Sequence, residues 1–142
     1  MTSTGERPAG QTVQVPWKMS SVMTVRRRMV SELRALDVDP TLVHDAEIVV
    51  SELVANAVRH AKALPDGTIR VGWTVGEGVV EVAVTDGGGP TTPRAAPHSL
   101  WSANGRGLRI VHTLAHEWGV RDDGSANTVW VSLGGPPSNH DQ

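Results

Sequence analysis

The chain has 142 residues, enough for one domain with a hydrophobic core, and 39% of them are hydrophobic. Its net charge of -2 at pH 7 gives no reason to expect DNA or an acidic membrane surface as the main partner. The absence of cysteine excludes disulfides, thiolate metal sites and cysteine nucleophiles. The N-terminus lacks a signal-peptide pattern and no apolar run approaches the length of a membrane span, so we expect a cytoplasmic protein.

The sequence predicts one folded domain over residues 12–133, between flexible tails at 1–11 and 134–142. Residues 12–17 alternate polar and apolar side chains, which predicts a short edge strand that ends at Pro16. A helix follows from about residue 20 to residue 36. One side of this helix is apolar, and the remainder carries the arginines Arg26, Arg27, Arg28 and Arg34. Such a run of charge is typical of a solvated helix face, although it would also suit a docked partner.

The most informative segment is a long helix that we expect from Pro40 to about residue 62, with Asp39 as its N-cap. Its apolar residues recur at helical spacing. Glu52, Asn56 and His60 are four residues apart, so they stack in a column that apolar side chains flank closely. Burying a carboxylate, an amide and an imidazole is costly without partners. The column therefore predicts a ligand, an ion or an internal hydrogen-bond network.

The second half of the domain is predicted to supply most of the sheet. The expected elements are an antiparallel hairpin of residues 68–75 and 79–85, a helix from about residue 105, and closing strands at 118–120 and 128–133. Between the hairpin and this helix, residues 86–105 are rich in glycine and proline, which predicts a lid, a binding loop or a disordered segment. This order predicts an α+β fold with a mixed, largely antiparallel sheet and helices on one face.

Two further segments suit a nucleotide. Asp86 ends a predicted strand and precedes three glycines, which let the backbone turn tightly and approach a ligand closely. A carboxylate fixed there can accept a hydrogen bond from an amino group such as that of adenine. Gly105, Arg106 and Gly107 open the next helix, whose N-terminal N–H groups and dipole favour phosphate. Singly, each segment is also typical of an ordinary network, turn or cap, whereas together they favour a nucleotide site.

The three segments, in this order and with a lid between the last two, resemble the GHKL ATPases, and most closely the small anti-sigma-factor serine/threonine kinases. Residues 52–57 with His60 match the N-box of that branch. Asp86 with Gly88 matches its first glycine box, and residues 105–108 match the second. The resemblance covers residues 12–133. It implies the Bergerat fold, an α/β sandwich that holds ATP between the helices and under the lid.

The resemblance implies a role for each matching residue. Glu52 is expected to be the general base, which accepts a proton from a substrate serine hydroxyl or from water. Asn56 is expected to coordinate Mg²⁺, which bridges the phosphates. Asp86 is expected to bind the adenine amine, and Gly88 to allow its close approach. The residues expected around the phosphates are Gly105, Arg106, Gly107 and Leu108, while Arg59 and His60 are expected to close the floor of the pocket.

Other features bear on activity or exclude other enzymes. The first glycine box of the family often ends in a glycine where this chain has Pro90, and the lid is short and contains prolines. Neither departure removes the nucleotide site, but both bear on whether the lid closes and hence on turnover. The P-loop pattern and the Gly-x-Ser-x-Gly elbow do not occur. His112 and His116 are four residues apart on a helix, but Thr113 stands where a metalloprotease requires glutamate.

The sequence leaves two main functions open. The first is an ATP-dependent serine/threonine kinase of the anti-sigma type, which phosphorylates a small antagonist protein and sequesters or releases a sigma factor. The retained Glu52 favours it, since ATP binding alone needs no base. The alternative is a nucleotide-dependent protein-binding module without phosphotransfer, or an ATPase-like regulator with another partner. ATP and Mg²⁺ are the expected cofactors, and proteins the expected partners. The arginine-bearing helix and the edge strand are the expected partner or homodimer surface.

Overall fold

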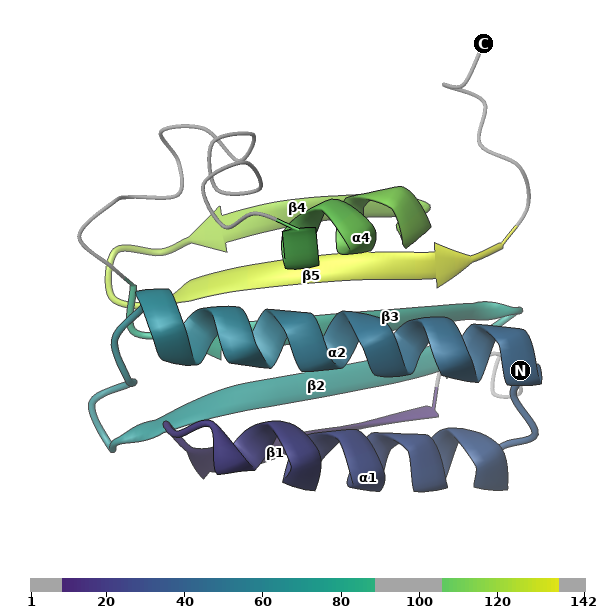
Figure 1. Ribbon diagram of the computed structural model, residues 1–142, viewed down its shortest axis with the longest axis horizontal. Helices are drawn as coiled ribbons and strands as arrows, with labels where there is room; N and C mark the ends of the chain where they lie inside the picture. Colours follow the sequence, from purple (N-terminus) through teal and green to yellow (C-terminus); the bar gives the residue numbers. More distant parts are fainter. Residues whose placement is uncertain (1–8, 89–105, 136–142) are drawn as a thin grey trace, which may run out of the picture.

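A computed structural model describes residues 9–88 and 106–135, and in these ranges five strands form one sheet that three helices cover on one face (Figure 1). The strands are β1 (Ala9–Pro16), β2 (Thr68–Gly76), β3 (Val79–Asp86), β4 (Glu117–Asp122) and β5 (Asn127–Gly134). The helices are α1 (Ser20–Ala35), α2 (Pro40–His60) and α4 (Arg106–Leu114). The predicted α+β class, with helices on one face of the sheet, is confirmed.

The sheet has the order β1-β2-β3-β5-β4, and every neighbouring pair of these strands is antiparallel. The described strands therefore contain no parallel pair. The reason lies in the closing hairpin. β3 and β4 run in the same direction but are not neighbours, because β5 runs in the opposite direction and lies between them. This insertion brings the first residue of β5 beside the last residue of β3, which proves important for the site.

The ends of the domain differ slightly from the predicted bounds. β1 lies at one edge of the sheet, as Pro16 predicts, but it begins at Ala9 rather than at Thr12. Residues 9–11, which the sequence assigns to a tail, pair with residues 73–75 of β2. Gly134, also assigned to a tail, is the last residue of β5. Residues 1–8 and 136–142 of the expected tails lie outside the described residues.

Local chemistry explains why two of these elements begin or turn where they do. The Asp39 carboxylate accepts hydrogen bonds from the backbone N–H groups of Thr41 and Leu42, at 3.1 and 3.4 Å, which confirms the predicted N-cap of α2. The hairpin between β2 and β3 turns at Glu77 and Gly78, which have φ of 52° and 76°. Two positive φ values are typical of the type I′ turn, whose twist suits a hairpin.

The core lies between the sheet and the helix layer. In β3 every second residue is buried, because successive side chains of a strand face opposite sides, and Val80, Val82 and Val84 point toward the helices. Met29 and Leu33 of α1 are fully buried one helical turn apart. Figure 1 shows α2 lying along the sheet between α1 and α4, so that α2 is the central helix of its layer. None of the helices in the described ranges is long and apolar enough to cross a membrane.

Candidate functional site

The candidate site begins with Asp86, the last residue of β3. The alternation of β3 turns its side chain to the same side as Val84, toward the helices, and only 5% of the residue is exposed. One carboxylate oxygen, Oδ1, accepts a hydrogen bond of 2.8 Å from the backbone N–H of Gly88. Gly88 has a φ of 88°, a conformation that side-chain-bearing residues rarely adopt. The glycine turn thus folds back onto the acid that precedes it.

The environment of Asp86 is unfavourable for a negative charge. Burial raises the pKa of its carboxyl group to about 6, and the hydrogen bond from Gly88 offsets only part of this effect. Within the described residues no cation forms an ion pair with Asp86. Because a pKa of about 6 lies below neutral pH, the carboxylate is mostly ionised at pH 7. Its second oxygen, Oδ2, has no hydrogen-bond donor among the described residues. Such a group is suited to accept a hydrogen bond from a ligand.

Asn127 is a second polar residue at this place, and the sequence analysis did not find it. It is the first residue of β5 and the direct cross-strand partner of Asp86. Its side chain is on the helix side, with 7% of the residue exposed, and its Oδ1 is buried without a hydrogen-bond partner. Directly opposed residues of an antiparallel pair have Cβ atoms about 5 Å apart. Two buried polar groups therefore stand side by side with unused hydrogen-bonding capacity.

Backbone pairing joins this acid to the end of α2. The N–H of Gly87 donates to the carbonyl of Lys62 at 2.8 Å, and the N–H of Lys62 donates to the carbonyl of Gly88 at 2.7 Å. A Cβ atom on Gly87 would collide with the carbonyl oxygen of Ala63. Gly87 is thus required for the close approach of the two segments. The sequence predicted that these glycines allow a ligand to approach closely, and it did not predict the contact of Gly87 with the segment that follows α2.

The polar column on α2 lies just before this junction. Glu52 and Asn56 are half-buried, whereas Arg59 and His60 are exposed. No hydrogen bond or ion pair within the described residues involves the side chain of Glu52 or Asn56. Of the three explanations that the sequence left open, an internal hydrogen-bond network is therefore not the one found in these ranges. The half-buried side chains of Glu52 and Asn56 are open to a ligand or an ion, and also to solvent.

The third predicted segment is described only in part. Arg106, Gly107 and Leu108 form the first turn of α4, which packs against α2. Gly105, Pro90 and the rest of the predicted lid lie outside the described residues. In Figure 1 the end of α2, the end of β3 and the start of β5 lie at the same end of the molecule. Asp86 and Gly88 thereby lie at the end of the sheet at which α2, the helix that carries the column, ends.

The comparison of the chain with protein families agrees with this arrangement. Residues 15–133 match the family described as the histidine kinase-like ATPase domain. The chain belongs to this family. The resemblance to the GHKL ATPases is confirmed, and membership of an ATPase family implies that the domain binds ATP. A search of the curated proteins finds no match.

Two solved structures share the fold of this ATPase domain. One contains the RsbU and RsbW domains of a Mycobacterium tuberculosis protein, with 22% identity, a TM-score of 0.67 and 91% of this chain covered. The chain spans only 34% of that protein's length. The other is the SiaB–SiaC complex of Pseudomonas aeruginosa, with 12% identity, a TM-score of 0.65 and 93% of each chain covered. At these identities the likeness concerns the fold.

Proposed function

We propose that this ATPase domain is an ATP-binding regulatory protein that transfers the γ-phosphate of ATP to a serine or threonine of a small partner protein. The observation that supports the proposal most is the pair of buried polar residues Asp86 and Asn127, of which Asn127 has a buried Oδ1 without a hydrogen-bond partner. Backbone pairing at Lys62 joins this pair to the segment that follows the helix carrying Glu52 and Asn56. A structural site would satisfy such groups internally. A buried polar atom without a partner, beside a buried acid, therefore supports a bound molecule at this place.

The chemistry of Asp86 favours adenine over guanine. Adenine carries an exocyclic amine, which donates a hydrogen bond, where guanine carries a carbonyl oxygen. An ionised carboxylate accepts from the amine but repels the carbonyl oxygen. The amide of Asn127 lies beside it and can pair with a neighbouring atom of the base. We therefore expect binding of ATP and ADP, and much weaker binding of GTP.

Asn56 suits the Mg²⁺ that accompanies ATP. Magnesium takes oxygen ligands and is usually held by one or two protein groups together with phosphates and water. The half-buried Asn56 amide has no partner in the described residues, and in those ranges no three acidic or histidine side chains cluster as a metal site. When bound, Mg²⁺ would neutralise the charge that develops on the transferred phosphate. Asn56 would hold and orient it.

Glu52 is one helical turn before Asn56 and is suited to be the general base. Its carboxylate has no ion pair in the described residues, so it is available to accept the proton of a hydroxyl group. A nucleotide-binding module would need Asp86 and Asn56 but no such carboxylate. Both similar structures contain a second protein or domain, which supports a protein as the substrate or partner of this chain. A sigma factor or a small antagonist protein is the partner that we propose.

The proposal is tested with labelled ATP, Mg²⁺ and candidate antagonist proteins. We expect phosphate on a serine or threonine of one candidate, loss of transfer in Glu52→Ala, and retained ATP binding in that variant. ATP binding without transfer to any candidate would favour the binding module. The nucleotide assignment itself fails if ATP does not bind at millimolar concentration, or if Asp86→Asn and Asn56→Ala bind ATP as well as the unaltered chain does.

A further inference from the structure

The outer surface of α1 has an unusual composition for a solvated helix. It carries four arginines and one glutamate, although acidic residues outnumber lysine and arginine in the whole chain, 15 to 13. Five large apolar side chains are exposed in the described ranges, and four of them lie in or next to α1: Trp17, Met19, Met23 and Leu36. Methionine, tryptophan and arginine are enriched at protein interfaces. The surface thus combines positive charge with exposed apolar side chains.

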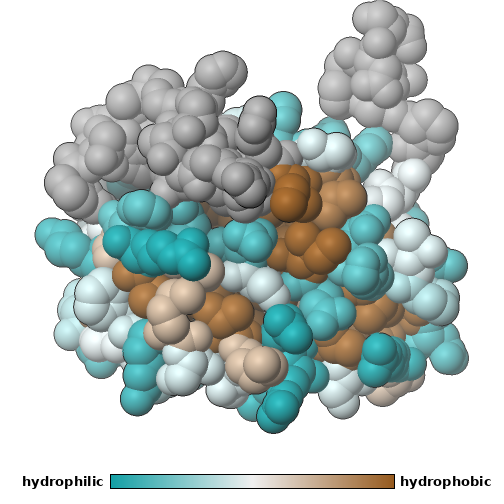
Figure 2. All heavy atoms as spheres, in the orientation of Figure 1, coloured by the Kyte–Doolittle hydropathy of each residue, from teal (hydrophilic) through white to brown (hydrophobic). Residues whose placement is uncertain are grey.

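These side chains are arranged along one line of the helix. Met19, Met23 and Arg27 are four residues apart, and Arg34 follows two turns later, so they share one side of α1. Figure 2, in the orientation of Figure 1, shows hydrophilic and hydrophobic residues interleaved over the region where α1 lies. A stripe that begins with methionines and ends with arginines would contact an elongated partner along its whole length.

The stripe borders a groove between α1 and α2. The groove has a volume of about 500 Å³ and is lined by Met23, Val30, Glu47 and the arginines Arg26, Arg27 and Arg34. A second hollow of about 370 Å³ continues it past Arg34 and Glu47 to His44. We call this continuous feature, from Met23 to His44, the α1 groove.

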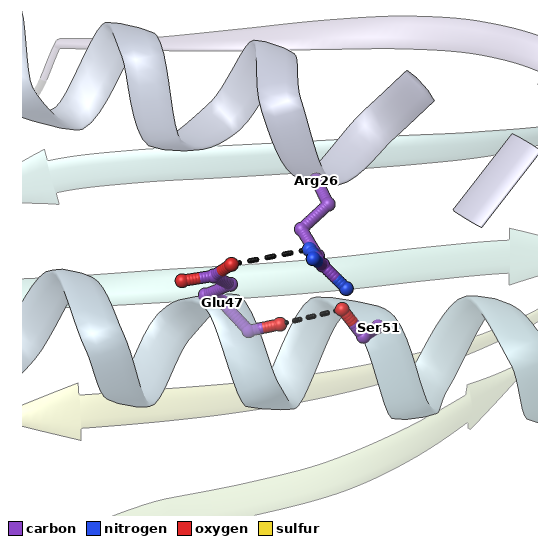
Figure 3. A network of polar contacts seen from close by, with 3 residues as sticks. All are labelled: Arg26, Glu47 and Ser51. Carbon is purple, nitrogen blue, oxygen red and sulfur yellow. Dashed lines mark hydrogen bonds and ion pairs between the residues drawn. The ribbon is translucent and has the colours of Figure 1, made fainter. Parts of the chain in front are cut away.

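Of the three arginines that line the α1 groove, one is already paired and two are not. Figure 3 shows Arg26 reaching across from α1 to α2, where its Nε lies 3.1 Å from Oε2 of Glu47. In the part of the chain that the structure describes, Arg27 and Arg34 form no ion pair. The floor of the groove is thus neutralised, and the guanidinium groups along its outer wall are left to bind carboxylates in the bidentate manner that arginine favours.

We propose that the α1 groove is the docking surface for an acidic segment of a partner protein that carries at least one large apolar side chain. The carboxylates of this segment pair with Arg27 and Arg34, and its apolar side chain packs on Met23. A second copy of this chain is a poor occupant of the same surface, because the arginines of one copy would face those of the other. The choice of a protein as occupant rests on the regulatory role proposed above.

The place of the groove connects docking to the candidate site. The Trp17 indole N–H donates a 3.3 Å hydrogen bond to the carbonyl of Ala57, so the methionine end of the stripe lies near the part of α2 that carries Asn56. At the other end, Glu47 accepts a 2.8 Å hydrogen bond from the Ser51 hydroxyl through its backbone carbonyl (Figure 3). A docked segment would therefore lie along the helix that carries the column, on the side of α2 that faces α1.

The proposal is tested by selecting 12-residue peptides from a random library on the unaltered chain, without nucleotide. We expect the selected peptides to be rich in Asp and Glu and to contain a large apolar residue. Their affinity for Arg27→Glu/Arg34→Glu should be about tenfold lower, because the two new glutamates repel the peptide carboxylates that the two arginines attract. Their affinity for Met23→Ser should also be lower. Arg70→Glu/Arg121→Glu changes the net charge equally at exposed positions outside α1, and should reduce the affinity less than threefold, about the effect of net charge alone.

Several results would overturn the proposal: basic or uncharged selected peptides, no selection at all, an equal loss in both double variants, or tighter binding of a short DNA duplex than of the peptides. Urea unfolding, measured separately, reports whether each variant is folded. Because the selection needs no nucleotide, a failure of docking and a failure of the proposed kinase activity are distinct results.

Discussion

Replacing Asp86 by asparagine should make the protein more stable and unable to bind ATP. The amide keeps the Oδ1 acceptor that the Gly88 N–H uses at 2.8 Å, but it removes a charge from a residue that is only 5% exposed. Its amino group would also face the amine of adenine, donor against donor. Stability and binding should therefore change in opposite directions, as is common for groups kept for function.

The magnitude follows from the pKa of the Asp86 carboxyl. Burial raises it from an ordinary 3.8 to about 6 in the folded chain. Between these values the folded state binds more protons than the unfolded state, so the contribution of Asp86 to stability falls as the pH rises through this window. At 1.36 kcal/mol per pKa unit, the ionised group costs about 3 kcal/mol above pH 6. We expect Asp86→Asn to gain up to this amount at pH 8 and nothing near pH 4.

The assay is urea unfolding of both proteins between pH 4 and pH 8 without nucleotide, followed by tryptophan fluorescence. Asp66→Asn is the matched control, because the hydrogen bond from the Thr68 hydroxyl lowers the pKa of the exposed Asp66 carboxyl. Its carboxylate contributes stability at neutral pH that is lost on acidification, so this variant should gain none at pH 8. A variant Asp86→Asn that is less stable than the unaltered chain at pH 8, or equally shifted at every pH, would refute the reasoning.

Three other substitutions separate the site from the core. Gly87→Ala should weaken ATP binding at least tenfold and lower the free energy of unfolding by about 1–3 kcal/mol, because the added methyl group collides with the Ala63 carbonyl and opens the pairing with Lys62. The control Gly72→Ala, where the nearest contact is the Thr12 hydroxyl at 3.2 Å, should bind ATP normally. Asn127→Ala removes a buried oxygen that has no partner, so ATP titration should show weaker binding while urea unfolding shows little change. Leu33→Ala should cost about 2–5 kcal/mol in urea unfolding and leave the affinity of the folded protein for ATP unchanged.

The features that the sequence determined by itself depend on neighbours along the chain. An aspartate before a proline caps α2, two residues with positive φ close the β2–β3 hairpin, and Pro16 marks an edge strand. The helical spacing of Glu52 and Asn56 needs only the 3.6-residue period. In each case the hydrogen bond or steric limit is made within a few residues, so the local pattern suffices.

Other features were decided only by tertiary structure, because they depend on segments far apart in the chain. Asn127 lies just outside the predicted strand of residues 128–133, and only the insertion of β5 beside β3 places it opposite Asp86. Residues 9–11 read as a tail until β2 supplies their hydrogen bonds. Gly87 meets the end of α2 across 25 residues of chain, a contact that no local pattern encodes. Pairing between distant segments sets the register of the sheet. This register buries Asp86 beside Asn127, close to the segment that follows the helix carrying Glu52 and Asn56.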